Sequence, residues 1–515
     1  MKIFSFSFSF TRILAGWLAL GSLTLAESKA FDLKTATVKS INEAFDAGTL
    51  TSEKLVSLYL ERIERYDRQG PKLEALISVN PQALAVARAL DLERKTKGPR
   101  SPLHGIPVIL KDNFNTRDLP TSGASIALKD LRPAHEAFVV KRLREAGAIV
   151  LAKSTLTELV RASLTPSIGG MAKNPYDLTR NPGQSSAGTG AALAANYAPL
   201  GTGTDNGQSV RSPASANSLF GLKPTIGLVS NAGVLPSSMS HNACGPITRS
   251  VADLAYLLNV MAGFDPDDCT TRLAIGQVEK NYERHLDPDG LKGARIGLVY
   301  ELLGNGPEHQ EVNRVVEAAA KRMTELGATV FPVVVPRMEE FQRSSTDLYE
   351  AYDLLNQWFA DLGPDAPYRS IEDFLERATY DKQIVPRILE QKKFAGAEYR
   401  DEYERKLLEM AQFRKIVVGT MDRFGLDALA YPMQKRLVSK HGEPNAERNG
   451  FLASNGMLPA LDIPIGYSTP SEDAPKGVPI GLDLLGRPYD EGRLIRLASG
   501  WEAKGWKRIE APFAP

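Results

Sequence analysis

Two segments rich in glycine carry serines, and a lysine ends an apolar run upstream of them. Ser185 and Ser186 lie in residues 181–190 (NPGQSSAGTG), and Ser209 lies in residues 201–211 (GTGTDNGQSVR). Such loops expose a hydroxyl beside several backbone N–H groups, which suits a nucleophile next to an oxyanion site. Lys111 follows the apolar run at 107–110, where burial would favour the neutral amine and allow it to act as a base. The pattern predicts acyl-transfer chemistry without histidine as the base.

Other catalytic and binding motifs fit this chain poorly. Arg211 stands where a G-x-S-x-G motif around Ser209 requires glycine, and the sequence has no H-E-x-x-H, Walker or paired-cysteine zinc motif. His104 is near Lys111 in sequence, but a lone histidine is more often structural than catalytic. The glycines at 183–207 could cradle a phosphate, yet their spacing matches neither phosphate-binding fingerprint. We therefore expect no metal and no organic cofactor.

Composition describes a large globular chain with little net charge. Of 515 residues, 43% are hydrophobic and 24% are charged, and the formal net charge is +1. A chain of this size can bury a substantial core. Its overall field favours neither nucleic acid nor an anionic membrane. Composition leaves the oligomeric state open and is compatible with a homodimer.

The N-terminus has the pattern of an export signal. Lys2 and Arg12 supply positive charge, residues 13–25 are mostly apolar, and small residues stand at Ala26 and Ala30. We expect a signal peptide over residues 1–26, cleaved after Ala26 or Ala30, and a periplasmic or secreted product. An uncleaved anchor or a disordered tail are the alternatives, although the apolar run is short for a membrane span. The mature chain shows no other apolar segment of spanning length.

The two cysteines, Cys244 and Cys269, belong to no metal-ligand or C-x-x-C spacing. In an exported protein they could form one disulfide. They could equally be two thiols that never meet, because sequence does not give their separation.

Apolar patterns along the chain alternate between strand and helix. This alternation favours an α/β fold with a large sheet covered by helices on both faces. No linker separates domains, so we expect one catalytic domain over residues 31–515, in which a helical elaboration at 338–424 borders a substrate cleft. Thr155-x-x-Glu158 also matches a helix capping box. We expect strands at 75–79, 107–110, 148–152, 200–204, 294–300, 329–335, 428–431 and 478–485, and helices at 37–47, 52–66, 81–96, 135–146, 188–196, 250–261 and 308–326.

The chain resembles the amidase signature family, whose members use a Ser–cis-Ser–Lys triad. The resemblance rests on residues 183–225, which end in SLFGLKPT, and on LHGIP at 103–107 with KDN at 111–113. It continues through GPITRS at 245–250, LPA at 458–460 and PIGL at 479–482. It thus spans nearly all of the mature chain, and it looks closest to exported, peptide-amidase-like members. The signal argues against the cytosolic relative that serves as the amidase component of glutamyl-tRNA amidotransferase.

The resemblance implies a role for each site residue. Ser209 is the nucleophile, Ser185 is the bridging serine preceded by a cis peptide bond, and Lys111 is the terminal base. The backbone N–H groups of the loop before and at the nucleophile stabilise the oxyanion, and three further side chains support the two loops. The oxyanion residues are Asn206, Gly207, Gln208 and Ser209, and the supporting residues are Ser186, Asp205 and Arg211, the last two as an ion pair.

Gln184 and Gln208 stand where this family commonly has glycine, so both side chains are candidates for substrate contacts. The expected function is hydrolysis of a small-molecule carboxylic amide through an acyl-enzyme on Ser209, with no nucleic-acid partner. An esterase or carbamate hydrolase with the same triad is the first alternative. A non-catalytic binding protein of this fold is the second, and the intact triad argues against it.

Overall fold

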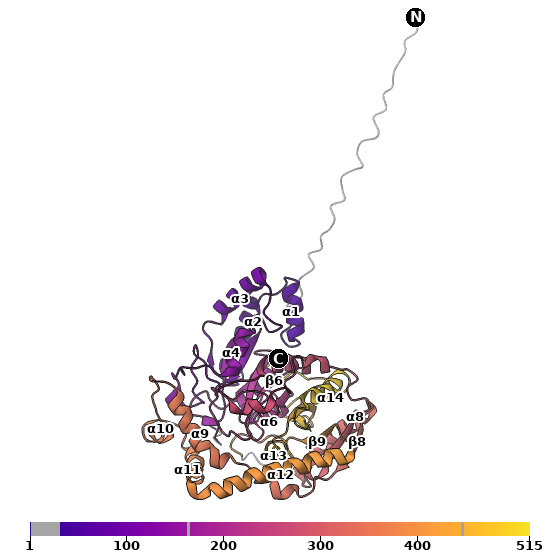
Figure 1. The fold of residues 1–515 in the computed structure, drawn as a ribbon. Coiled ribbons are helices and arrows are strands. Elements are labelled where there is room, and N and C mark those ends of the chain that lie inside the picture. The colour runs from indigo at the N-terminus through magenta and orange to yellow at the C-terminus, as the bar shows by residue number, and fades with distance from the viewer. Residues whose placement is uncertain (2–30, 162–164, 444–446) are drawn as a thin grey trace.

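The protein is described by a computed structural model that covers residues 1, 31–161, 165–443 and 447–515 (Figure 1). Across these residues, eleven strands form one sheet in the order β1-β3-β2-β4-β6-β5-β10-β11-β9-β7-β8. The strands are β1 Leu76–Val79, β2 Pro107–Lys111, β3 Ile149–Ser154, β4 Leu200–Asp205, β5 Phe220–Lys223, β6 Ala243–Thr248, β7 Arg295–Val299, β8 Thr329–Val333, β9 Ala428–Pro432, β10 Ala460–Tyr467 and β11 Pro479–Leu485.

The sheet is mixed and joins both halves of the chain. Strand β2 runs parallel to β3 and β4, and β7 runs parallel to β8 and β9, whereas the other pairs are antiparallel. The halves meet where Ala460 of β10 pairs with Lys223 of β5. The predicted large mixed sheet is therefore confirmed.

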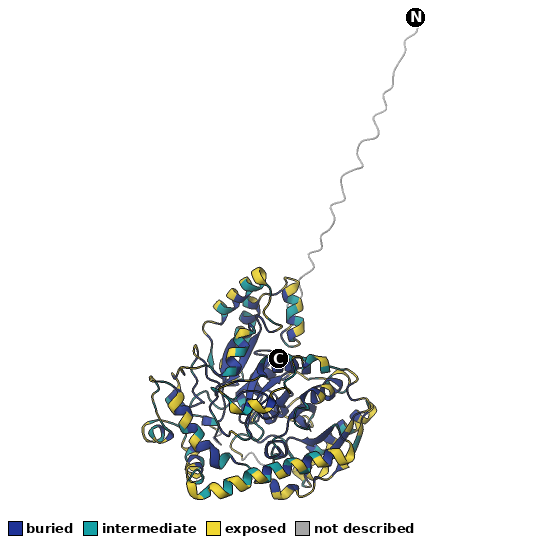
Figure 2. Ribbon diagram, viewed as in Figure 1, coloured by how far each residue is buried: buried dark blue, intermediate teal, exposed yellow. Residues whose placement is uncertain are grey.

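Helices cover the sheet, because its central strands are buried on both faces. Every residue of β2 to β6 is buried, although successive side chains point to opposite faces. Figure 2 shows this buried centre inside helices whose outer sides are exposed. The helices are α1 Val38–Asp46, α2 Ser52–Ile63, α3 Ala83–Lys97, α4 Phe138–Glu145, α5 Ala187–Ala194, α6 Arg211–Ala216, α7 Val251–Met261, α8 Gln310–Glu325, α9 Asp347–Asp361, α10 Ile371–Arg377, α11 Val385–Phe394, α12 Arg400–Phe424, α13 Phe451–Asn455 and α14 Glu491–Lys504.

The helical elaboration expected at 338–424 is present as α9 to α12, and α12 runs along one rim of the molecule (Figure 1). Helices α9, α10 and α11 share a small apolar core with Leu128, Leu159 and Leu235, which belong to loops beside the sheet. None of the helices described is both long and apolar enough to cross a membrane.

The capping box expected at Thr155 and Glu158 is wrong. A short 3-10 turn, Glu158–Val160, begins after Thr157 without a side-chain cap. The Glu158 carboxylate instead accepts hydrogen bonds from the backbone N–H groups of Ser167 at 2.8 Å and Asp381 at 3.2 Å. It thus connects two loops rather than capping a helix. The Ser250 cap of α7 is confirmed, because its hydroxyl accepts from the N–H of Asp253.

Helix α5 lies unusually close to the sheet because its residues are small. A Cβ atom on Gly188 would lie 2.2 Å from the carbonyl oxygen of Ala75 and 2.5 Å from the nitrogen of Thr155. Both contacts are with backbone, which cannot rotate away. Glycine at this position therefore sets the spacing between α5 and the ends of β1 and β3.

We predict that Gly188→Ala lowers the free energy of unfolding by roughly 1–3 kcal/mol, because the new methyl group forces backbone apart. Gly419→Ala is the matched control, since Gly419 lies exposed in α12 with open space around its Cβ position. That change should stabilise by about 0.5–1 kcal/mol. Thermal denaturation of the three proteins measures the effect. A Gly188→Ala protein that melts with the wild type would contradict the close approach.

Candidate active site

Lys111 ends strand β2 and places its amine in the interior of the protein. Its Nζ donates to Ser185 Oγ at 2.8 Å and to Thr204 Oγ1 at 2.7 Å. The side chain is fully buried, and no carboxylate of the described chain forms an ion pair with it. Asn113 donates to the same Thr204 hydroxyl at 3.1 Å, which fixes that hydroxyl beside the amine.

Burial lowers the pKa of Lys111 from 10.5 to about 7, because the ammonium form loses its hydration. The negative charge of Asp205 opposes this shift without cancelling it. Lys111 can therefore be neutral near neutral pH and accept a proton.

Ser185 lies on a loop that brings it to this amine. The peptide bond between Gln184 and Ser185 is cis, as the family resemblance implies. Gly183 precedes it with φ of 80°, where a Cβ atom would lie 2.5 Å from the carbonyl oxygen of Ser212. Ser185 itself is 6% exposed. The hydroxyl of neighbouring Ser186 donates to the carbonyl oxygen of Ser209, so the two serine loops are joined directly.

Ser209 is half-buried on the loop that follows β4. The N–H groups of Val210 and Arg211 donate to Asp205 Oδ2 at 3.2 and 3.4 Å. By contrast, the N–H groups of residues 206–209 have no hydrogen-bond acceptor in the described parts of the chain. These are the donors that could stabilise an oxyanion.

A buried ion-pair network holds this loop. Arg211 lies 3.0 Å from Asp205 and 2.6 Å from Asp483 of β11, and all three side chains are fully buried. Its Nη2 also donates to the carbonyl oxygens of Gly207 at 2.8 Å and Gly450 at 3.2 Å. Burial alone would raise the pKa of Asp205, but Arg211 holds it below its ordinary value. The Asp205–Arg211 pair expected from the sequence is thus present, with a second aspartate that the sequence did not indicate.

A cavity of about 330 Å³ exposes both serines. Ser185 and Ser209 line it together, although the structure gives no direct hydrogen bond between their hydroxyls. Its further lining residues come from the loop after β3, from α9 and α11, and from the segment before α13. They are Thr157, Val160, Arg161, Gln184, Asn206, Gly207, Gln208, Ser237, Asp347, Arg387, Gln391 and Arg448.

Sequence reasoning missed Thr204 and the charged lining residues. Thr204 belongs to the alternating GTGT run of β4, where its place beside Lys111 depends on the pairing of β2 with β4. Arg161, Asp347, Arg387 and Arg448 lie outside every motif, so only the fold brings them to the serines.

Both cysteines are free thiols, so the disulfide is not formed. Cys244 is buried in β6 and Cys269 is exposed. Burial raises the pKa of the Cys244 thiol, which keeps it protonated. Neither thiol lines the cavity.

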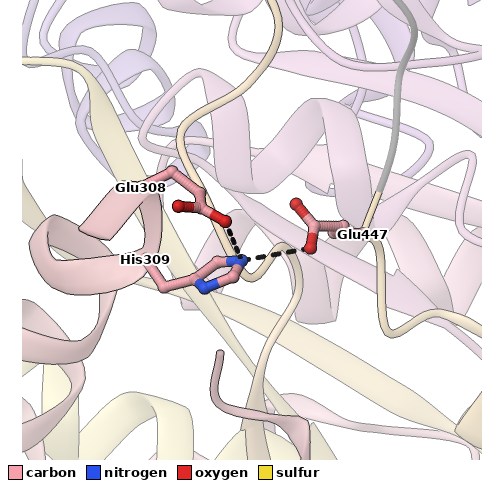
Figure 3. Close-up of side chains that lie close together, drawn as sticks. All are labelled: Glu308, His309 and Glu447. Atoms are coloured by element: carbon pink, nitrogen blue, oxygen red, sulfur yellow. Dashed lines mark hydrogen bonds and ion pairs between the residues drawn. The ribbon is translucent and has the colours of Figure 1, made fainter. Parts of the chain in front are cut away.

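Figure 3 shows a cluster of metal-binding residue types, Glu308, His309 and Glu447, away from the serines. The Nδ1 atom of His309 accepts from the N–H of Gly306 at 2.8 Å. The neutral ring therefore carries its proton on Nε2, which faces Glu447 Oε1 at 3.1 Å. A metal would need the lone pair at that nitrogen, so hydrogen bonding explains the cluster.

Comparisons with known proteins agree with this site. The amidase family model matches residues 54–495. A probable amidase of Arabidopsis thaliana is 34% identical over 493 residues, which cover 92% of this chain and 91% of the relative. The amidase component of glutamyl-tRNA(Gln) amidotransferase from Caldanaerobacter subterraneus subsp. tengcongensis is 32% identical over 94% of this chain and 99% of its own length. Native peptide amidase from Stenotrophomonas maltophilia superposes with a TM-score of 0.83 at 33% identity, covering 92% of this chain and 98% of that chain. The chain therefore belongs to the amidase family and is a hydrolase of the carbon–nitrogen bond of amides.

Proposed function

We propose that the protein hydrolyses a small carboxylic amide to an acid and ammonia or an amine through an acyl-enzyme on Ser209. The observation that carries this proposal is the buried Lys111 amine, 2.8 Å from Ser185 Oγ and without an ion-pair partner in the described chain. A base of this kind needs a neutral amine, and burial supplies one. Ser209 is the serine that shares a cavity with Ser185 and stands beside uncommitted N–H donors.

Acylation follows from these positions. Neutral Lys111 takes a proton from Ser185, which takes one from Ser209, and Ser209 Oγ bonds to the carbonyl carbon. The N–H groups of residues 206–209 stabilise the oxyanion, an interaction worth roughly 3–4 kcal/mol per donor. The proton then returns through Ser185 to the amide nitrogen as the carbon–nitrogen bond breaks. In deacylation, water attacks the acyl carbon, loses its proton through the same relay and releases the acid.

The first prediction concerns the nucleophile. Ser209→Ala should lower kcat by roughly 10⁴- to 10⁶-fold, because no other group in the cavity forms the acyl bond. A serine-directed fluorophosphonate should label the wild type and not this variant, with unchanged Tm as the control for folding. Turnover or labelling by a well-folded Ser209→Ala protein would refute the assignment, and an unlabelled wild type would favour a binding protein.

The second prediction concerns Lys111. Below a pH of about 7 the amine is protonated and cannot act as a base, so kcat/KM for an amide should rise with pH through this value and then level off. Lys111→Met fills a similar volume without the amine. It should remove the acidic limb of the profile and impair amides more than activated esters, because an amine leaving group needs the returned proton.

Measuring kcat/KM against pH for one amide and its activated ester counterpart tests this role. An unchanged profile in Lys111→Met, or equal loss on both substrates, would contradict it. The ester arm also addresses the alternative of an esterase or carbamate hydrolase, since the same acyl-enzyme forms from either substrate. A wild-type preference for esters over amides with the same leaving-group basicity would favour that alternative.

We also propose that the protein is exported to the periplasm or secreted. The support is the charged, apolar and small-residue pattern of the N-terminus, whose predicted signal over residues 1–26 lies outside the described residues. Intact-mass analysis of protein from a bacterial periplasm should find a chain that begins near Glu27 or Phe31. Replacing Ala26 and Ala30 with bulky residues should block processing. A soluble cytoplasmic product that keeps residues 1–26 would overturn the proposal.

A further inference from the structure

The charged side chains that line the cavity are unequal in number and sign. They are Arg161, Arg387 and Arg448, against the single carboxylate of Asp347. Arg387 forms an ion pair with Asp347, whose other oxygen accepts from Ser345 Oγ at 2.6 Å. The aspartate is thus committed, and two guanidinium groups remain.

Arg448 has no carboxylate partner in the described chain. Its contact is with the side-chain amide of Gln208, whose oxygen, when turned toward it, accepts from Nε at 2.9 Å and from Nη2 at 3.1 Å. The neighbouring Glu447 carboxylate faces away, toward Arg436 Nε at 3.2 Å and His309 Nε2 at 3.1 Å. Burial lowers the pKa of Arg448 to about 10, and no nearby acid offsets it. An uncompensated cation of this kind is costly to keep in a protein interior.

Arg161 is in the same condition and is only 3% exposed. Its Nε donates to Gln391 Oε1 at 2.9 Å and its Nη1 to the carbonyl oxygen of Leu159 at 3.0 Å, both neutral acceptors. Its Nη2 is buried and has no hydrogen-bond partner among the described residues. Burial lowers the pKa of Arg161 to about 10. A donor is therefore left for a group that enters the cavity.

Gln208 connects this positive lining to the chemistry. It immediately precedes Ser209, so Arg448 is held one residue away from the proposed nucleophile. The two loops are in close contact, because a Cβ atom on Gly450 would lie 2.2 Å from the carbonyl oxygen of Gly207. A substrate whose carbonyl carbon reaches Ser209 can therefore reach the Arg448 guanidinium with a short chain.

We propose that the substrate of this enzyme carries a carboxylate in addition to its amide, and that Arg448 and Arg161 bind this carboxylate. The inference rests on the proposed function, since it describes the substrate of the same site. A guanidinium edge matches the two oxygens of a carboxylate in a planar pair. The low-dielectric walls strengthen that attraction and disfavour a cationic substrate. A cavity of about 330 Å³ suits a short ω-carboxy amide.

Three sets of amides with matched chain lengths test the proposal. Succinamate, glutaramate and adipamate end in a carboxylate, butyramide, valeramide and hexanamide end in a methyl group, and 4-aminobutyramide ends in an ammonium. The wild type should prefer a carboxylate over a methyl terminus by about tenfold or more in kcat/KM, and should reject the ammonium. Arg448→Gln should reduce the carboxylate-to-methyl ratio by about 10- to 100-fold. Arg161→Gln should also reduce it.

Two further variants separate a specificity role from a structural one. Arg448→Lys keeps the charge and should retain part of the preference, with most of its loss in KM. Arg436→Gln is the matched control, because Arg436 lies in the same segment but pairs with Glu447 and does not line the cavity. Its ratio should equal that of the wild type. A ratio that stays constant in Arg448→Gln, or a wild type that prefers methyl-terminated amides, would overturn the proposal.

A binding measurement distinguishes failure of this inference from failure of the proposed function. Calorimetry with glutarate should show binding to the wild type that weakens about 10- to 100-fold in Arg448→Gln. Glutarate binding without turnover of any amide set would uphold the carboxylate site and refute the hydrolase mechanism. Turnover of neutral amides without glutarate binding would uphold the mechanism and refute the carboxylate site.

Discussion

The buried guanidinium of Arg211 holds together the segments from which the site is built. It joins Asp205 at the end of β4 to Asp483 in β11, and it also bonds the carbonyl oxygens of Gly207 and Gly450. Losing one partner from such a buried network costs about 3–5 kcal/mol, because a charge is left uncompensated. The loop that carries Ser209 is therefore positioned by strands and loops from the far half of the chain.

Two buried lysines on adjacent strands show how neighbours decide a charge state. Lys153 of β3 lies 2.7 Å from Asp112, so its ammonium form is compensated. Lys111 of β2 is equally buried, but its amine faces the hydroxyls of Ser185 and Thr204. Hydroxyl groups solvate an amine without neutralising a positive charge. The same residue type thus serves as a structural cation on one strand and supplies a proton acceptor on the next.

Much of the sheet could be predicted from local patterns, but its middle could not. Strands β2, β4 and β7 are short apolar or alternating runs, and their positions were expected. Strands β5, β6 and β10 were not expected as strands. Gly245 and Pro246 in β6, and Pro464 in β10, argue locally against a strand, and only pairing with distant segments overrides them. The arginines of the cavity were missed for a related reason, since no local pattern distinguishes them from surface arginines.

The reacting groups and the remaining cavity wall come from different layers of the molecule. Lys111, Ser185 and Ser209 stand on the central strands and the loops beside them, whereas Asp347, Arg387 and Gln391 come from the outer helices α9 and α11. Substitutions in the outer layer can change the wall without disturbing the packed strands beneath. Relatives with the same serine loops can therefore diverge in what they accept. Transfer of a substrate from one family member to another should accordingly be judged on residues 157–161, 347–391 and 447–455 rather than on the serine segment.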